Sequence, residues 1–434
     1  MKKSPFAAQS GILSTRYEIG LVLIISFILK SLIRIMLIEN HNYWETGYDF
    51  YYKIARNFVT SGSYYLSPGD QTFYLADKLY AIRTPLYPLL IAAIGALTEF
   101  SAPLFIILQA AISTITVWLV YLISRTLSTA KGALLAAILC AFYPYSVFHD
   151  TQLQENALYN CVSLASVWYL LLAYRTKKAG HFAWAGFFLG LATLTRASHL
   201  VHTMFLAIWI FWTLRQTFKK AALGFCILIC TFTLCLSPWL IRNKIRLGAF
   251  TLTSMTGPSL LIAHNKSTFL FYPYKGSIDK STQQLVFDLK NSGTLDQMRI
   301  AGKNELVQSQ KFKEMALAYI LGHKLETLKR GIYKTAVNFL GVLSPLKEWW
   351  ENIAYFLSYW TLTLLSIFSF HKTRRTPFFQ IFILLCVSQA IFSFVFFAHS
   401  SHRSFLDPML AVFAGIGLSQ LLARASIGQV GRKK

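Results

Sequence analysis

The sequence predicts an all-α polytopic membrane protein with about ten transmembrane helices and two loop regions on the outer, periplasmic face. Of its 434 residues, 55% are hydrophobic and 14% are charged, which is more apolar surface than a water-soluble core can hide. Apolar runs recur along the chain, and many reach the roughly 20 residues that a helix needs to cross a bilayer core about 30 Å thick. Short basic loops separate these runs. Together the three observations indicate a bundle of membrane-spanning helices.

Ten apolar runs are expected to span the membrane. They lie near residues 17–38, 103–124, 132–149, 156–174, 182–199, 200–214, 221–239, 353–370, 378–398 and 405–423. No small-residue cleavage site follows the first run, so we expect a retained helix rather than a signal peptide.

Basic residues mark one side of the membrane. They flank alternate runs at Lys2, Lys3 and Arg16, at Arg125 and Lys131, at Arg175, Lys177 and Lys178, at Arg215, Lys219 and Lys220, at Lys372, Arg374 and Arg375, and from Arg424 to Lys434. Short cytoplasmic loops carry such an excess of Lys and Arg, so both termini are expected in the cytoplasm. The formal charge of +24 reflects this bias, and nucleic-acid binding is not expected.

Two segments interrupt the rhythm, and both are expected outside. Residues 39–102 form a first external loop, in which 85–97 is apolar but too short to span, as in an interfacial or re-entrant helix. Residues 240–352 form a larger external region for which we expect no core of its own. The chain thus divides into a transmembrane module at 1–239, this external region, and C-terminal transmembrane helices at 353–434.

The first external loop carries a charged helical face. Asp49, Tyr52, Lys53 and Arg56 stand three or four residues apart, so they share one side of a helix. A carboxylate beside two cations just above the bilayer suits a reaction that handles a phosphate. The alternative, which spacing alone favours, is an ordinary surface ion pair between Asp49 and Lys53.

Three further charged residues stand at the outer ends of predicted helices. Arg83 precedes two prolines at the mouth of an apolar helix, where a guanidinium binds phosphate bidentately or simply snorkels to the interface. Glu155 begins the fourth run, where a carboxylate is costly and indicates a functional site. Arg196 closes the fifth run. Asp150, by contrast, is expected to be a solvated loop residue.

Histidines gather near the last external turns. His399, His402, Arg403 and Asp407 cluster at the outer end of the last two runs. No third ligand stands at a dependable spacing, so no metal site is predicted. His264 follows the seventh run, in a stretch expected to form a turn and a strand.

Six blocks, in order, make the chain resemble the membrane glycosyltransferases of the GT-C class, in particular the bacterial family of protein O-mannosyltransferases and lipid A aminoarabinose transferases. They read D-F-Y-Y-K-I-A-R-N-F at 49–58, R-T-P-L-Y-P-L-L-I-A at 83–92, Q-E-N-A-L-Y at 154–159, G-L-A-T-L-T-R at 190–196, P-W-L-I-R-N at 238–243 and H-R-S-F-L-D-P at 402–408. The resemblance implies a GT-C-like fold in a bacterial inner membrane. It also implies transfer of a sugar from a polyprenyl-phosphate carrier to an acceptor on the outer face.

The resemblance also implies roles for individual residues. The general base falls on Asp49, and the motif near the donor phosphate falls on Arg83. Glu155 is the second catalytic candidate, expected to position the acceptor or tune the base. Other cations expected to face the phosphate are Lys53, Arg56, Arg196 and Arg403, and residues expected at an acceptor or loop site are Tyr52, His264 and His402. Phe50 stands where many relatives carry a second acidic residue, and Asp407 where relatives often carry an apolar one.

The chemistry needs few groups. A carboxylate takes the proton of an acceptor hydroxyl while cations stabilise the departing lipid phosphate, which suffices for direct displacement with inversion. No cofactor is predicted, and a divalent metal is left open. The expected partners are the polyprenyl-phosphate sugar, membrane lipid, and a glycolipid, polysaccharide or protein acceptor. The sequence leaves the sugar and the acceptor open.

Three alternatives belong to other classes. A lipid or saccharide transporter or flippase would show charges near the middle of its spans, and here Lys30 and Arg34 are the main ones. An enzyme like an O-antigen polymerase or ligase would rely on Arg and His in a large late loop. A non-catalytic scaffold would require nothing of Asp49.

Overall fold

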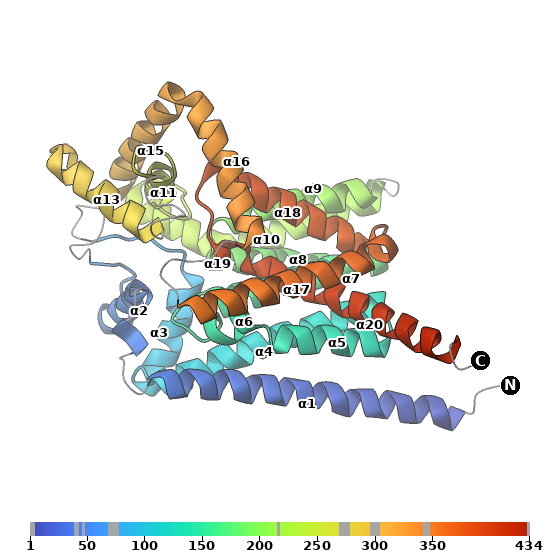
Figure 1. Cartoon of the computed structure of the whole chain (residues 1–434). Coiled ribbons are helices and arrows are strands. Elements are labelled where there is room, and N and C mark those ends of the chain that lie inside the picture. Colours follow the sequence, from blue (N-terminus) through green and yellow to red (C-terminus); the bar gives the residue numbers. More distant parts are fainter. Residues whose placement is uncertain are drawn as a thin grey trace.

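The computed structural model describes residues 5–38, 43–45, 48–67, 78–214, 218–268, 278–295, 304–341 and 348–431. In these ranges the regular secondary structure is helical, with one isolated antiparallel bridge between Leu66 and Leu79. Long helices lie side by side, and both termini are at the same end of the bundle (Figure 1). The predicted all-α polytopic architecture is confirmed.

Seven helices of the described chain are long and apolar enough to cross a membrane. They are α1 (Pro5–Ile38), α4 (Ala102–Leu127), α7 (Asn156–Thr176), α10 (Phe218–Leu247), α17 (Trp349–Thr373), α18 (Pro377–Val395) and α20 (Asp407–Gly431). Two shorter helices, α8 (Ala179–Thr195) and α9 (His199–Leu214), pack against them, α8 between α7 and α10. These nine helices coincide with nine of the predicted runs.

The remaining predicted run, 132–149, was expected to be a single helix, and this prediction is wrong. The run consists of α5 (Ala130–Ala141) and α6 (Pro144–His149). Pro144 has no amide hydrogen to donate, and its ring blocks continuation of the preceding turn, so α6 starts anew at this residue.

Asp150, at the end of α6, is correspondingly not solvated, and that prediction is wrong. It is 2% exposed and accepts hydrogen bonds from Ser113 at 2.5 Å and Ser146 at 2.6 Å. Lys30 of α1 is 3.9 Å from the same carboxylate oxygen and donates to both serines. A buried carboxylate needs such a partner and such donors to stay in an apolar bundle.

The first external loop forms η1 (Tyr43–Glu45), α2 (Asp49–Ser61) and α3 (Leu86–Thr98). The short apolar helix expected near 85–97 is therefore present as α3. One face of α2 buries Tyr51, Ile54 and Ala55, which leaves its charged face outward. The helix ends at Gly62, whose left-handed backbone (φ 66°) lets its N–H donate to the Phe58 carbonyl.

The regular secondary structure of the second external region, in its described part, is helical. It contains α11 (Thr256–Ala263), α13 (Ile278–Asn291), α15 (Glu305–Gly322) and α16 (Lys324–Leu340), and α19 (Ser400–Arg403) and η3 (Ser404–Leu406) lie beyond α18. The strand expected before His264 is wrong, because this stretch is α11. Tyr272-Pro273-Tyr274 lies outside the described residues.

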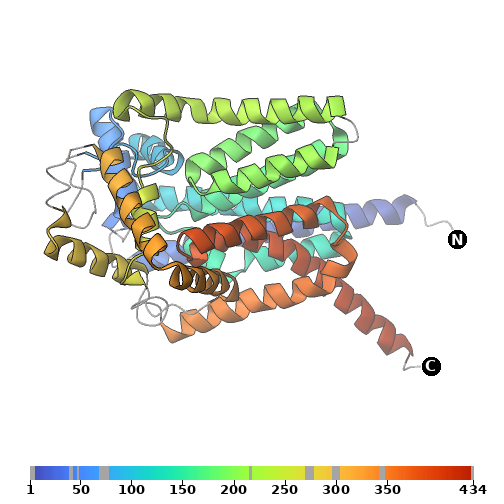
Figure 2. The ribbon, with the colours of Figure 1, turned by 90° about the horizontal axis from the view of Figure 1, so that it is seen from above.

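This region also has a small apolar core, contrary to the prediction. Leu261 of α11, Leu289 of α13 and Phe312 of α15 are buried in one cluster. Gly257 lets α11 and α15 approach closely, since a Cβ there would lie 1.8 Å from the Ser309 carbonyl oxygen. The view turned by 90° shows the external helices at one end and the termini at the other (Figure 2).

Candidate active site at the end of the bundle opposite to the termini

The sequence-predicted residues lie at the end of the bundle opposite to the termini, where Glu155 pairs with Arg196 and Asp49 pairs with Lys53. There α2 and α3 lie on one side and α11, α13 and α15 on the other, and α3 also packs against α8 (Figure 1). This end is where the polar side chains of distant segments come into contact.

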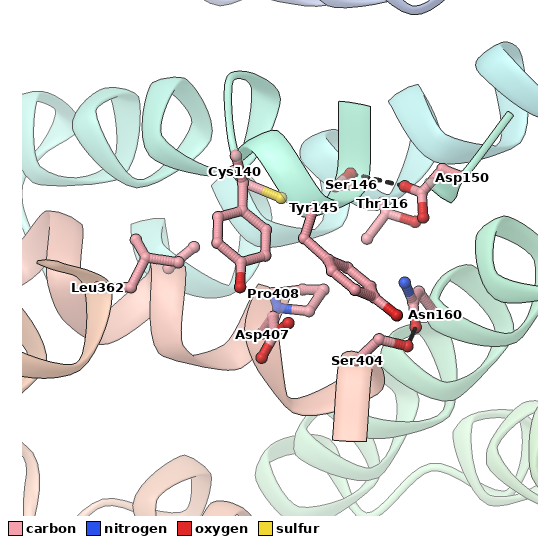
Figure 3. A pocket seen from close by; sticks show the side chains of 12 residues that line it. Thr116, Cys140, Tyr145, Ser146, Asp150, Asn160, Leu362, Ser404, Asp407 and Pro408 are labelled. Carbon is pink, nitrogen blue, oxygen red and sulfur yellow. Dashed lines mark hydrogen bonds between the residues drawn. The ribbon is translucent and has the colours of Figure 1, made fainter. Parts of the chain in front are cut away.

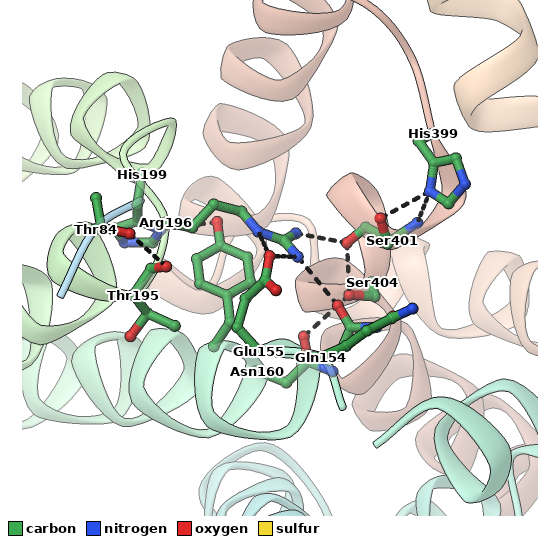
Figure 4. Close-up of polar contacts among 12 residues, drawn as sticks. Thr84, Gln154, Glu155, Asn160, Thr195, Arg196, His199, His399, Ser401 and Ser404 are labelled. Carbon is green, nitrogen blue, oxygen red and sulfur yellow. Dashed lines mark hydrogen bonds and ion pairs between the residues drawn. The ribbon is translucent and has the colours of Figure 1, made fainter. Parts of the chain in front are cut away.

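Glu155 and Arg196 form the centre of this arrangement (Figure 4). Arg196 donates to Glu155 Oε1 from Nη2 at 2.6 Å and from Nε at 3.0 Å, and the Tyr51 hydroxyl donates to Oε2 at 2.6 Å. Both charged side chains are nearly enclosed, at 13% and 11% exposure. Burial by itself would raise the pKa of Glu155, but the Arg196 charge and the hydrogen bonds outweigh burial and hold the pKa at about 2.

A carboxylate with this pKa is a weak proton acceptor. Both of its oxygens accept hydrogen bonds, Oε1 from Arg196 and Oε2 from Tyr51, which fixes the carboxylate in place. Arg196 extends the contact further, donating to Asn156 Oδ1 at 3.1 Å and to the Ser401 carbonyl at 2.7 Å (Figure 4). The pair thus joins the start of α7, the end of α8 and the short helix α19.

Asp49 is the first residue of α2 and is partly open to solvent. Its carboxylate lies 2.5 Å from the Lys53 ammonium, with side-chain exposures of 35% and 58%, so the surface ion pair that the spacing predicts is present. Arg56 is exposed one turn further on. Tyr52, on the same side, stacks on Trp44 at a ring separation of 4.8 Å.

Arg83 lies directly beside the start of α2. Its guanidinium lies 4.2 Å from the centre of the Phe50 ring and 5.9 Å from that of Tyr51. Within the described chain it forms no ion pair, and its Nε is buried without a hydrogen-bond partner. Stacking on aromatic faces orients a guanidinium without neutralising it.

Arg403 makes contacts of a different kind. It is buried, lies 3.8 Å from Asp407 and stacks on Tyr359 at 3.6 Å. Asp407 lines a small internal cavity together with Asp150 and Asn160 (Figure 3). The Arg403 guanidinium thus faces Asp407 and Tyr359 inside the bundle, although its Nε and Nη1 have no hydrogen-bond partner among the described residues.

The two histidines expected at an acceptor or loop site, His264 and His402, are packed into the structure. His264 lies 2.6 Å from the Val395 carbonyl oxygen through Nε2. Burial, with the nearby charge of Lys334, lowers its pKa to about 4, so this ring is neutral at pH 7. His402 packs between the rings of Phe392 and Phe397. Among the described residues no group of three or more His, Cys, Asp or Glu side chains is arranged to hold a metal ion.

Sequence reasoning missed several polar groups of this end. The Tyr51 hydroxyl donates to Glu155, and Glu305 accepts from the Ala81 N–H, two residues before Arg83. Neither Tyr51 nor Glu305 was predicted as a site residue. Ser404 donates to Asn160 Oδ1 at 3.2 Å and to the Ser401 carbonyl at 2.9 Å, which links the cavity to Arg196. A polar residue inside an apolar run, such as Asn160, was the available signal.

Comparison with known proteins gives a family match and a fold match. Residues 82–263 match the sequence model described as dolichyl-phosphate-mannose-protein mannosyltransferase. No curated protein matches the chain. This matched segment contains the blocks at 83–92, 154–159, 190–196 and 238–243.

Among solved structures, the archaeal oligosaccharyltransferase AglB from Archaeoglobus fulgidus, in complex with an inhibitory peptide and a dolichol-phosphate, is similar with a TM-score of 0.55 and 13% identity, covering 96% of this chain and 52% of that one. An oligosaccharyltransferase of the same organism tethered with an acceptor peptide gives a TM-score of 0.57 and 14% identity, covering 94% and 50%. ArnT from Cupriavidus metallidurans bound to undecaprenyl phosphate gives a TM-score of 0.38 and 11% identity, covering 97% and 80%.

The chain spans about half the length of the oligosaccharyltransferases that it matches. At such low identity these two structures bear on the fold alone. The family match and this fold together confirm the predicted resemblance of the chain to the GT-C class of membrane glycosyltransferases.

Proposed function

We propose that the protein transfers a sugar from a polyprenyl-phosphate carrier to an acceptor on the outer face of a bacterial inner membrane. Asp49 acts as the general base. The matching family is described by a dolichyl-phosphate sugar donor, and AglB was solved with a dolichol-phosphate. A prenyl phosphate is thus named in the description of the family and is bound by a protein of similar fold, which supports a lipid-phosphate donor here.

The observation that carries the proposal is that Arg83 lacks a carboxylate partner within the described chain. Lys53, Arg196 and Arg403 each have a carboxylate partner. Arg83 has none within the described chain, yet it is held against Phe50, the residue after Asp49. An uncompensated guanidinium held against the residue that follows Asp49 suits a reaction in which the departing group is a phosphate anion.

The chemistry then divides between the two residues. Asp49 accepts the proton of the acceptor hydroxyl as the oxygen attacks the anomeric carbon, and the bond to the lipid phosphate breaks. Arg83 stabilises the charge on the departing phosphate. The configuration inverts, because a single displacement occurs on the face opposite to the leaving group. Glu155 and Arg196 hold α7, α8 and α19 in register around this site.

The orientation follows from charge. A cleft at the α17–α18 turn and the end of α20 is lined by His371, Lys372, Arg374, Arg375 and Arg424. This basic end is expected in the cytoplasm. The site, at the opposite end of the bundle (Figure 1), then faces outward.

The test compares lipids from strains that carry the wild-type gene, a deletion, or Asp49→Asn at matched membrane levels. Mass spectrometry measures prenyl-phosphate sugars and envelope glycoconjugates. The proposal predicts that the deletion and Asp49→Asn both lose one sugar mass from an acceptor and accumulate a prenyl-phosphate sugar. A normal profile in Asp49→Asn, with an altered one in the deletion, would contradict it.

One observation favours a second function, that of a lipid or saccharide transporter. The ion pairs Lys30–Asp150 and Arg403–Asp407 are buried inside the bundle, and both aspartates line the same small cavity (Figure 3). Transporters carry such intramembrane charges. A transporter would be impaired by Asp150→Asn and unaffected by Asp49→Asn, whereas the transferase requires Asp49.

A further inference from the structure

The segment that carries Arg83 has no helix or strand of its own. Residues 80–85 run as bends between the Leu66–Leu79 bridge and α3. Such a segment directs a side chain only when its backbone groups are held from outside. The hydrogen bonds of these residues therefore decide where Arg83 points.

Glu305, the first residue of α15, holds one side of this segment. The N–H groups of Tyr80 and Ala81 donate to its Oε1 at 3.0 and 2.8 Å, and the Ser254 hydroxyl donates to Oε2 at 3.3 Å. The side chain is 1% exposed. Two backbone donors converging on one buried carboxylate oxygen fix the path of the chain just before Arg83.

The connection between α10 and α11 also forms hydrogen bonds with the segment 80–85. The Ser254 N–H donates to the Ala81 carbonyl at 2.8 Å, and the Thr253 hydroxyl donates to the Ile82 carbonyl at 3.2 Å. Arg242, at the end of α10, donates to the Tyr80 carbonyl at 2.5 Å. The segment thus pairs with external residues along its length.

The far side of the segment is tied to the site. The Tyr64 hydroxyl donates to the Arg83 carbonyl at 3.0 Å. The Thr84 hydroxyl donates to the Thr195 carbonyl at 2.8 Å, next to Arg196 (Figure 4). Glu305 therefore acts on a short strip of backbone whose other end is fixed at the end of α8.

The support behind Glu305 is rigid. Asn304 caps α15 by accepting from the Leu306 N–H, and α15 packs against α11. The Gly257 N–H donates to the Ser309 hydroxyl at 3.2 Å at the point of closest approach. A displacement of this helix pair is transmitted to the segment through Glu305.

We propose that Glu305 is a positioning residue that fixes the direction of Arg83 and so couples the external region to binding of the donor phosphate. This inference rests on the proposed function. It gives the external region a role in the reaction without contact between Glu305 and the substrate.

The experiment measures binding of undecaprenyl phosphate to purified full-length protein in detergent. The variants are Glu305→Ala, Arg83→Met, the double variant, and Glu314→Ala as a control on the exposed side of the same helix. Glu305→Ala and Arg83→Met are each expected to weaken binding on the order of tenfold. The double variant is expected to equal Arg83→Met, because Glu305 acts through Arg83.

Additive losses in the double variant would overturn the inference, as would wild-type binding in Glu305→Ala when Arg83→Met is impaired. Absence of binding by the wild-type protein would instead overturn the proposed function. Glu305→Asp is measured in parallel because it keeps the charge and the fold while withdrawing the carboxylate by one methylene. It is expected to give an intermediate loss, and wild-type binding in this variant would count against the inference.

Discussion

Asp49 is partly exposed and pairs with Lys53, and this makes its role separable from its contribution to the fold. Its ion pair with Lys53 is solvent-exposed, and such pairs contribute about 0.2–1 kcal/mol to stability. Asp49→Asn is therefore expected to fold normally and to lose transfer by roughly 10²–10⁴-fold, the range for a general base. The matched control is Lys53→Met, which breaks the same pair and keeps the base. Equal losses in both variants would assign the effect to the pair.

The pH dependence of stability separates the two buried glutamates. The pKa of Glu155 is about 2, below its usual 4.5, so its contribution to stability is present above pH 4.5 and is lost as the pH falls toward 2. The pKa of Glu305 is raised to about 6 by burial, against opposing backbone hydrogen bonds. The folded state then binds this proton more tightly, and stability declines as the pH rises from 4.5 to 6.

This decline is about 2 kcal/mol for a shift of this size. Glu305→Gln removes the ionisation and is expected to flatten the wild-type fall in Tm between pH 4.5 and 6. Thermal unfolding of the two proteins in detergent across this range checks the prediction. Parallel slopes would mean that Glu305 does not titrate in this window.

For individual residues, the sequence predicts contacts between neighbours along one helix but not contacts between distant segments. The Asp49–Lys53 pair follows from a spacing of four residues. The burial of Asp150 depends on Lys30, which is supplied by α1, and no local pattern reveals which distant helix faces a given side chain. The partners of Glu155 were missed for the same reason.

Among the elements, the contact between α11 and α15 makes a sharp prediction. A Cβ at Gly257 would meet the Ser309 carbonyl at 1.8 Å, whereas nothing lies within 4 Å of a Cβ at Gly322. Gly257→Ala is expected to separate the two helices and to make the external region sensitive to protease. Gly322→Ala, in the same helix pair, is expected to leave it resistant. Limited proteolysis of both proteins decides this, and equal resistance would contradict it.

Helices were predictable from the length of apolar runs, but their breaks were not. Pro144 begins a new helix, whereas Pro238 lies inside α10, which continues to Leu247. The same residue type interrupts one helix and is accommodated in another. Residue type alone therefore does not predict where a helix breaks.

For the whole molecule, the distribution of charge predicts its orientation in the membrane. A fluorescent protein fused to the C-terminus is expected to fluoresce in the cytoplasm. A short epitope inserted after Gly293, in the turn that follows α13, is expected to be accessible from outside in spheroplasts. Detection of both tags from the same side would refute the proposed topology.

The overall architecture was largely predictable because a membrane imposes the length of its helices. The location of the site residues at one common end of the bundle followed from the same reasoning. Their mutual contacts did not, because the rotation of each helix is set by packing with its neighbours. Arg196 meets Glu155 from 41 residues away, and Glu305 meets Ala81 from 224 residues away.

The most direct test of the central claim uses the purified protein itself. Wild-type and Asp49→Asn proteins are reconstituted separately in vesicles with a lipid extract from the deletion strain, and products are followed by mass spectrometry. The account predicts that the wild-type protein removes a sugar from the accumulated prenyl phosphate and adds the same mass to an acceptor, and that Asp49→Asn does neither. Transfer by both proteins would show that Asp49 is not the base, and transfer by neither would contradict the assignment as a glycosyltransferase.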